Sequence, residues 1–153
     1  MKQHFALLLV AGALATSCNS QDIATDKVPA VVINALSAQF PDAVGTEWEK
    51  KNAFYEADFD MPDGTDVTVQ VDGSGKIMMH KKDVAVTALP ATIQTLVQNN
   101  YKDFTIEEVE TVEKDGSVFY QVELDGKGLK GLKDKKLVFG ADGQETTAFK
   151  YWD

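Results

Sequence analysis

The stretch DKVPAVVINALSAQFPD (residues 26–42) recurs in altered form as TALPATIQTLVQNNYKD (residues 87–103), 61 positions further along the chain. In both copies apolar residues return every four positions, which is the spacing of an amphipathic helix. The two stripes are Val28, Val32, Leu36 and Phe40, and Leu89, Ile93, Val97 and Tyr101. Asp26 or Thr87 is expected to cap each helix, with Pro29 or Pro90 in its first turn. The constant offset indicates an internal repeat.

Strand-like segments separated by Gly and Asp turns follow each helix. After the first helix they are residues 45–50, 54–59, 67–71 and 76–84, and after the second 105–113, 118–124, 135–139 and 146–152. Strict alternation, as in Val67, Val69 and Val71, predicts strands that bury one face. We therefore expect an α+β fold of two tandem α-β-β-β-β repeats. Each repeat would be a helix packed on a four-stranded antiparallel sheet, and the two sheets could continue into one another.

The N-terminal region has the features of a secretory signal peptide. Lys2 precedes an apolar run, residues 5–14, that is too short for a permanent membrane helix. Residues 13–15 fit ordinary cleavage and release, whereas Ala15-Thr16-Ser17-Cys18 resembles the lipobox of bacterial lipoproteins. We expect an exported protein of the periplasm or outer membrane, anchored by a lipid on Cys18.

These features divide the chain into four parts. Residues 1–18 are assigned to the signal peptide, 19–26 to a linker, 27–84 to the first repeat and 85–153 to the second. One repeat alone would have a small core, and the second repeat supplies the missing contacts.

A secreted chain of two such repeats, with helices opening on Val28-Pro29 and Leu89-Pro90 and Gly-rich hairpins between strands, resembles the PepSY-like family. That family is also called β-lactamase-inhibitor-protein-like, and its members are small periplasmic or lipid-anchored bacterial proteins. The resemblance covers residues 27–153. It implies a concave sheet that binds or inhibits a protein partner in the envelope, without catalysis, and it transfers no site residues.

The amino-acid composition argues against several classes of binding partner and catalytic site. The chain carries 15 Lys, no Arg and 24 acidic residues, for a net charge of −9. This balance disfavours nucleic acid, whose binding is driven by neutralising phosphates. Cleavage before Cys18 would leave His80 as the only histidine and no other cysteine, so cysteine nucleophiles and Cys-rich zinc sites are excluded. We expect no enzymatic activity.

The acidic loop around Pro62 allows three interpretations. Asp58, Asp60, Asp63 and Asp66 offer the oxygen ligands that Ca²⁺ prefers, although their spacing departs from an EF-hand loop. Pro-Asp-Gly is also typical of an ordinary solvated hairpin turn. Finally, Asp63 could present a carboxylate to a partner from a stiff tip. The alternative function is thus a calcium-responsive or ligand-sensing envelope protein.

Aromatic residues provide the other candidate contacts. Trp48, Tyr55, Tyr120 and Trp152 could face outward from the sheet and anchor a protein partner. Cross-strand aromatic packing explains the same pattern equally well. The preferred function is a binding or inhibitory protein that uses the concave sheet face and its hairpin loops.

Overall fold

The computed structural model describes residues 21–126 and 133–153. The strands are β1 (Gln21–Asp22), β2 (Val44–Lys50), β3 (Phe54–Asp60), β4 (Asp66–Asp72), β5 (Ile77–Asp83), β6 (Thr105–Lys114), β7 (Ser117–Asp125) and β8 (Lys135–Gly140). The helices are α1 (Ala30–Gln39) and α2 (Ala91–Asn100), which follow the short 3-10 turns η1 (Thr25–Lys27) and η2 (Val86–Ala88). No helix in the described ranges is long and apolar enough to cross a membrane.

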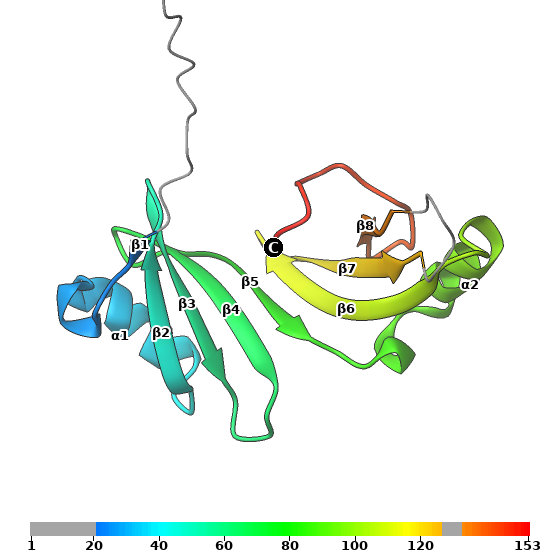
Figure 1. Cartoon of the computed structure of the whole chain (residues 1–153). Helices are drawn as coiled ribbons and strands as arrows, with labels where there is room; N and C mark the ends of the chain where they lie inside the picture. Colours follow the sequence, from blue (N-terminus) through cyan, green and yellow to red (C-terminus); the bar gives the residue numbers. More distant parts are fainter. Residues whose placement is uncertain (1–20, 127–132) are drawn as a thin grey trace, which may run out of the picture.

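All eight strands form one antiparallel sheet in which each strand pairs with its neighbour in sequence. The expected pair of four-stranded sheets is therefore replaced by a single sheet, because β5 of the first repeat pairs with β6 of the second. Figure 1 shows this sheet curving, with α1 and α2 at its two outer ends and the C-terminal segment between the two halves.

The strand register places both helices on the same face of the sheet. Residues opposite one another on paired strands project to the same side. His80 lies opposite Val69 on β4 and Glu113 on β6. Its ring packs edge-on against Phe40 at the end of α1, with ring centroids 5.5 Å apart. Val109 of β6 projects to this side and belongs to the core under α2. We call this side the helix-bearing face and the opposite side the helix-free face.

Each helix closes its own hydrophobic core, as the repeat predicts. Val32 and Leu36 of α1 pack on β2, β3 and β4, and Ile93 and Val97 of α2 pack on β6, β7 and β8. Burial of these stripes removes apolar surface from water at both ends of the sheet.

The expected side-chain caps are wrong. Asp26 and Thr87 lie in η1 and η2, and neither helix has a side-chain cap hydrogen bond. Pro29 and Pro90 occupy the N-cap positions instead, one residue before the first helical turn. A residue that precedes proline is pushed into an extended conformation, so the helix cannot begin earlier.

The expected strand at residues 146–152 is also wrong. Beyond β8 the chain makes one bridge, between Phe139 and Glu145, and the Thr146 amide donates to the Val138 carbonyl. The segment then leaves the sheet edge and crosses the helix-free face. The other seven expected strands correspond to β2 through β8.

Two glycines hold equivalent hairpins against the two helices. Gly75 and Gly143 have φ angles of +88° and +80°. A Cβ atom on Gly75 would lie 2.9 Å from the carbonyl oxygen of Val31, and one on Gly143 would lie 2.5 Å from Oγ1 of Thr92. Val31 and Thr92 are themselves related by the repeat offset of 61. These turns therefore need glycine for both conformation and close approach.

We predict that Gly75→Ala destabilises the protein more than Gly116→Ala does. Gly116 also has a positive φ, +75°, but a Cβ there would meet nothing within 4 Å. The control should cost about 1 kcal/mol for backbone strain alone. Gly75→Ala should cost about 1–3 kcal/mol more, because it also collides with α1. Urea denaturation measures both values, and equal losses would contradict the packing argument.

Candidate functional site

Three of the four candidate aromatics lie on the helix-bearing face. Trp48 is only 4% exposed and belongs to the first core, so the expectation that it faces outward is wrong. Tyr55 and Tyr120 are partly buried against the first and second cores. Their sequence neighbours Phe54 and Phe119 therefore project to the helix-free face. A contact role for Tyr55 and Tyr120 stays a prediction, and Trp48 offers almost no surface for one.

Trp152, the fourth aromatic, lies on the helix-free face and is 7% exposed. Its indole N–H donates to Oε2 of Glu56 on β3 at 3.1 Å. Its main-chain N–H donates to Oε1 of Gln121 on β7 at 2.8 Å. One residue near the C-terminus thus joins strands from both repeats. The face that was expected to be open is partly covered by the chain itself.

Gln121 forms hydrogen bonds with both the main-chain N–H and the main-chain carbonyl of Trp152. It is fully buried, and its Nε2 donates both to the Trp152 carbonyl at 3.0 Å and to Oε2 of Glu110 at 2.6 Å. Lys81 donates to the same carbonyl at 3.2 Å. Every hydrogen-bonding atom of the Gln121 amide is therefore used, as a buried amide requires.

Two buried carboxylates in this network are neutralised by lysines. Glu56 pairs with Lys51 at 3.1 Å and also accepts from Gln70. Glu110 pairs with Lys81 at 2.7 Å. Buried ions are tolerated only when they are paired and hydrogen-bonded, and both conditions hold here. We call the set formed by these side chains with Gln121 and Trp152 the tail network.

We predict that Gln121→Leu lowers the free energy of unfolding by about 3 kcal/mol or more. The substitution leaves the Trp152 peptide group without its main partner and removes one donor from Glu110, and each buried unsatisfied polar group costs about 1–3 kcal/mol. Gln98→Leu, at an exposed position on α2, is the matched control and should change stability by about 0.5 kcal/mol at most. Chemical denaturation measures both, and a small effect of Gln121→Leu would refute the role of the tail network.

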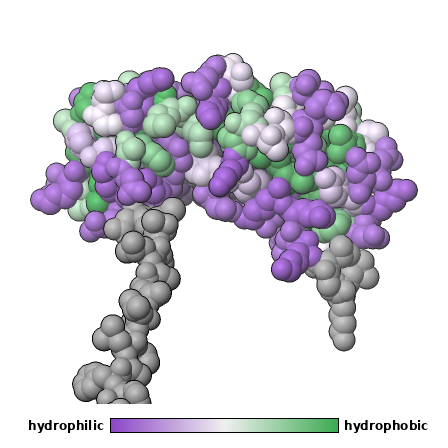
Figure 2. Space-filling view, turned by 90° about the horizontal axis from the view of Figure 1, so that it is seen from above, coloured by the Kyte–Doolittle hydropathy of each residue, from purple (hydrophilic) through white to green (hydrophobic). Residues whose placement is uncertain are grey.

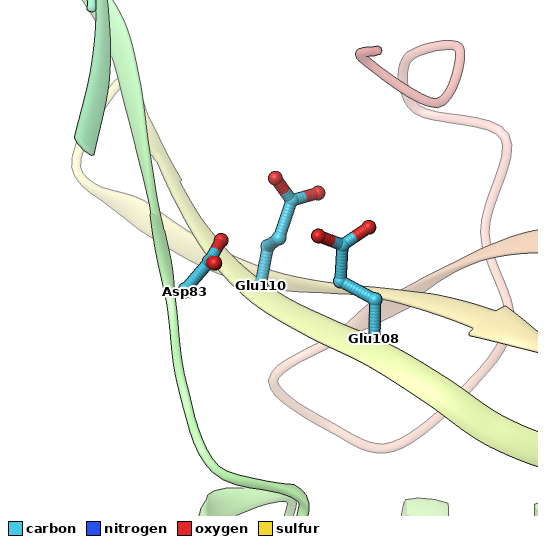
Figure 3. A group of neighbouring side chains, drawn as sticks. All are labelled: Asp83, Glu108 and Glu110. Atoms are coloured by element: carbon cyan, nitrogen blue, oxygen red, sulfur yellow. The ribbon is translucent and has the colours of Figure 1, made fainter. Parts of the chain in front are cut away.

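An acidic row crosses the helix-free face beside the tail network. Asp60 lies opposite Asp66, and Asp83 lies opposite Glu110. The pairing of Val67 with Lys82 continues the row from Asp66 to Asp83. Figure 3 shows Asp83, Glu110 and the nearby Glu108 projecting from β5 and β6 to the same side. Carboxylate oxygens of these last three residues lie within 4.8 Å of one another.

Cations compensate the row only in part, since Lys81 pairs with Glu110 and acts at longer range on Asp83 and Glu108. Within the described ranges, Asp58, Asp66, Asp83 and Glu108 form no ion pair with a lysine inside 4 Å. Burial, together with the charges of Glu110 and Asp66, raises the pKa of Asp83. Burial and the neighbouring carboxylates also raise the pKa of Glu108 and, despite a hydrogen bond from Thr68, that of Asp58. Like charges on directly opposed residues destabilise a sheet.

We predict that Asp83→Asn raises the free energy of unfolding by about 0.5 kcal/mol at pH 7.5. A raised pKa in the folded state means that the charged form destabilises the fold above that pKa, and that the penalty disappears as the pH falls through it. The gain should therefore shrink as the pH is lowered towards 4. Asp103→Asn, on the exposed turn after α2, should show no such trend when stability is measured by denaturation at each pH.

No three of the four expected calcium ligands lie close enough to share an ion. Among the described residues, the only three acidic, histidine or cysteine side chains close enough to share an ion are Asp83, Glu108 and Glu110. Both oxygens of Glu110 are already engaged by Lys81 and Gln121. The four aspartates of the loop do not gather in this way.

Asp63, at the tip of the hairpin between β3 and β4, is exposed, and its carboxylate bonds to a residue of the same hairpin. Its Oδ1 accepts the Thr65 amide at 3.0 Å, and hydrogen bonds from the Thr65 hydroxyl and from this amide lower the pKa of Asp63. Beside this hairpin a cavity of about 460 Å³ is lined by apolar atoms of Phe40 and Met61 and by His80 and Lys82. Burial lowers the pKa of His80. Cys18, the expected lipidation site, lies outside the described residues.

A family described as "Putative beta-lactamase-inhibitor-like, PepSY-like" matches the chain over residues 14–79 and again over 62–144. The two matches overlap over residues 62–79, and together they cover most of the chain. No curated protein matches this chain.

Three solved structures from Bacteroides are similar to this fold. A DUF2874 family protein from Bacteroides uniformis is 25% identical, with a TM-score of 0.68 over 76% of this chain and 85% of that one. A BLIP-like protein from Bacteroides fragilis is 23% identical, with a TM-score of 0.64 over 77% and 82%. A protein from Bacteroides eggerthii, described as a "putative periplasmic" one, is 21% identical, with a TM-score of 0.70 over 77% and 85%.

Proposed function

This chain belongs to the beta-lactamase-inhibitor-like, PepSY-like family, and we propose that it is a non-enzymatic envelope protein that binds a basic surface of a protein partner. The contact surface in this proposal is the acidic row on the helix-free face. Family membership confirms the resemblance seen in the sequence and is consistent with an inhibitor-like role.

The observation that carries the proposal is the crowding of like charge in the row. Asp83 lies close to Asp66 and to Glu108 on this face, although the repulsion lowers stability and Lys81 offsets only part of it. Sites where crowded like charges lower the stability of the fold are frequently functional. A cationic partner would relieve the repulsion, and the net charge of −9 would speed its approach.

The surface chemistry supports electrostatic rather than apolar recognition. On the face shown in Figure 2, hydrophobic residues form small patches separated by hydrophilic ones. The hairpin with Asp63 at its exposed tip adds a further carboxylate contact in this proposal. Tyr55 and Tyr120 lie on the opposite, helix-bearing face, so this contact surface does not include them.

Affinity capture from a bacterial envelope extract tests the proposal. The wild-type chain should retain a basic protein at low ionic strength and release it as salt is raised, because exposed charge pairs are screened. Asp83→Asn/Glu108→Gln should reduce the captured amount at least about tenfold, the loss expected when about 1.4 kcal/mol of binding is removed.

Asp42→Asn/Asp103→Asn is the matched control. It changes net charge by the same amount at two exposed turns related by the repeat, and it should capture normally. Equal capture by both double variants would show that the partner contacts a surface other than the acidic row. Failure of the wild type to retain any basic protein would reject the proposed function.

We further propose that the chain is exported and anchored by a lipid on Cys18. The description of the Bacteroides eggerthii structure as periplasmic supports export of this type of protein. The wild type should then sediment with membranes, and Cys18→Ala should appear in the soluble periplasmic fraction. A wild type that is already soluble would contradict the anchor.

The rival function is a calcium-responsive protein that uses Asp58, Asp60, Asp63 and Asp66. Under this alternative, millimolar Ca²⁺ raises the melting temperature more than NaCl of equal ionic strength, because a ligand specific to the native state stabilises it. Asp60→Asn/Asp63→Asn should abolish the difference. Identical shifts in the two salts would leave only charge screening and reject the rival.

A further inference from the structure

The C-terminal segment, residues 147–153, is held on the helix-free face in the manner of a bound peptide. Its main chain makes no backbone–backbone hydrogen bond to the described strands. Beyond Thr146 it is fixed by side chains of the sheet that reach its last residues. The strands and both cores are complete without it.

We call the side chains of Glu56, Lys81 and Gln121, which hold Trp152, the seat. The seat binds both the main chain and the indole side chain of this residue. Gln121 binds both the N–H and the carbonyl of Trp152, which any extended residue could offer. Glu56 accepts the indole N–H, which only tryptophan presents in this geometry. Lys81 adds a charge-assisted bond to the carbonyl. The seat therefore selects an extended segment that carries tryptophan.

Flanking contacts extend this selection on both sides of Trp152. Phe149 packs edge-to-face on Phe119 with ring centroids 5.1 Å apart, and the Lys114 ammonium lies 5.5 Å from the Phe149 ring. Lys136 lies 4.9 Å from the Tyr151 ring and pairs with the Asp153 carboxylate. The preferred ligand is thus an aromatic segment that ends in tryptophan followed by an acidic residue.

We propose that this seat is a peptide-binding site for the C-terminal segment of a second copy of this chain, filled in the single chain by its own segment. A second copy carries the identical C-terminal segment. If each copy placed its segment in the seat of the other, the two would form a two-fold symmetric dimer through the same contacts. Trp152 lies six residues after Thr146, a segment that spans up to about 20 Å when extended, which allows the tryptophan to leave its own sheet.

Each copy carries a net charge of −9, so pairing of copies strengthens as ionic strength rises. Capture of a basic partner through the acidic row has the opposite salt dependence. The evidence for the peptide site is the set of contacts made by residues 147–153, which do not involve the basic partner. The peptide site and the proposed function can therefore fail independently.

A labelled synthetic peptide of residues 147–153, added to the full chain, tests the seat. Trp152→Ala should bind it saturably in fluorescence anisotropy, and at least about tenfold more tightly than the wild type, whose own segment competes. A peptide with alanine in place of its tryptophan should not bind. If a folded Trp152→Ala chain binds neither peptide, or binds both equally, the site is overturned.

Folding is checked by circular dichroism. Should Trp152→Ala prove unfolded, the peptide must restore its structure for the site to stand, and failure to restore it overturns the site.

Mixing two variants tests the occupant. Trp152→Ala keeps the seat but lacks the ligand, and Gln121→Leu keeps the ligand but lacks the seat. By sedimentation in high salt, each alone should be monomeric and the mixture should form a one-to-one complex. Glu56→Leu, which removes the acceptor of the indole N–H, replaces Gln121→Leu if the latter does not fold. Peptide binding without any mixed complex would overturn the second copy as occupant.

Discussion

The pairing of β5 with β6 is the constraint on which the rest of the structure depends. It joins two repeats, each with its own helix and core, into a single sheet with a fixed register. Because the side-chain period of a strand is two, a slip of one residue would put the helices on opposite faces. In the observed register both helices cover one face. The other face is left for the acidic row and the C-terminal segment.

Polar contacts stabilise the helix-free face together with apolar packing such as that of Phe149 on Phe119. Glu56, Glu110 and Gln121 are buried there, their lysine partners are partly buried, and all are satisfied. Such a network contributes little net energy when complete and is costly when one member is missing. It therefore specifies where Trp152 lies more than it adds stability.

The acidic row and the tail network divide this face between them. Glu110 belongs to both, because it ends the row and also accepts from Gln121. Asp66 and Asp83 form no such ion pair within 4 Å, and both side chains are exposed. An inhibitor-like family and a crowded acidic surface are both consistent with recognition through charge, which needs position and not catalytic geometry.

The sequence by itself determined the two helices, seven of the strands and the tandem repeat, because periodicity and turn residues are local signals. It could not assign the faces. In Phe54-Tyr55 and Phe119-Tyr120 both neighbours are aromatic, so alternation does not tell which one is buried. Trp48 lies between Glu47 and Glu49, so alternation alone indicates burial there, and the outward placement went against that pattern. Only the tertiary structure brought Asp66 beside Asp83, and Trp152 onto Glu56 across 96 positions of sequence. Those contacts depend on strand register and on the path of the last residues, and no short-range pattern encodes either.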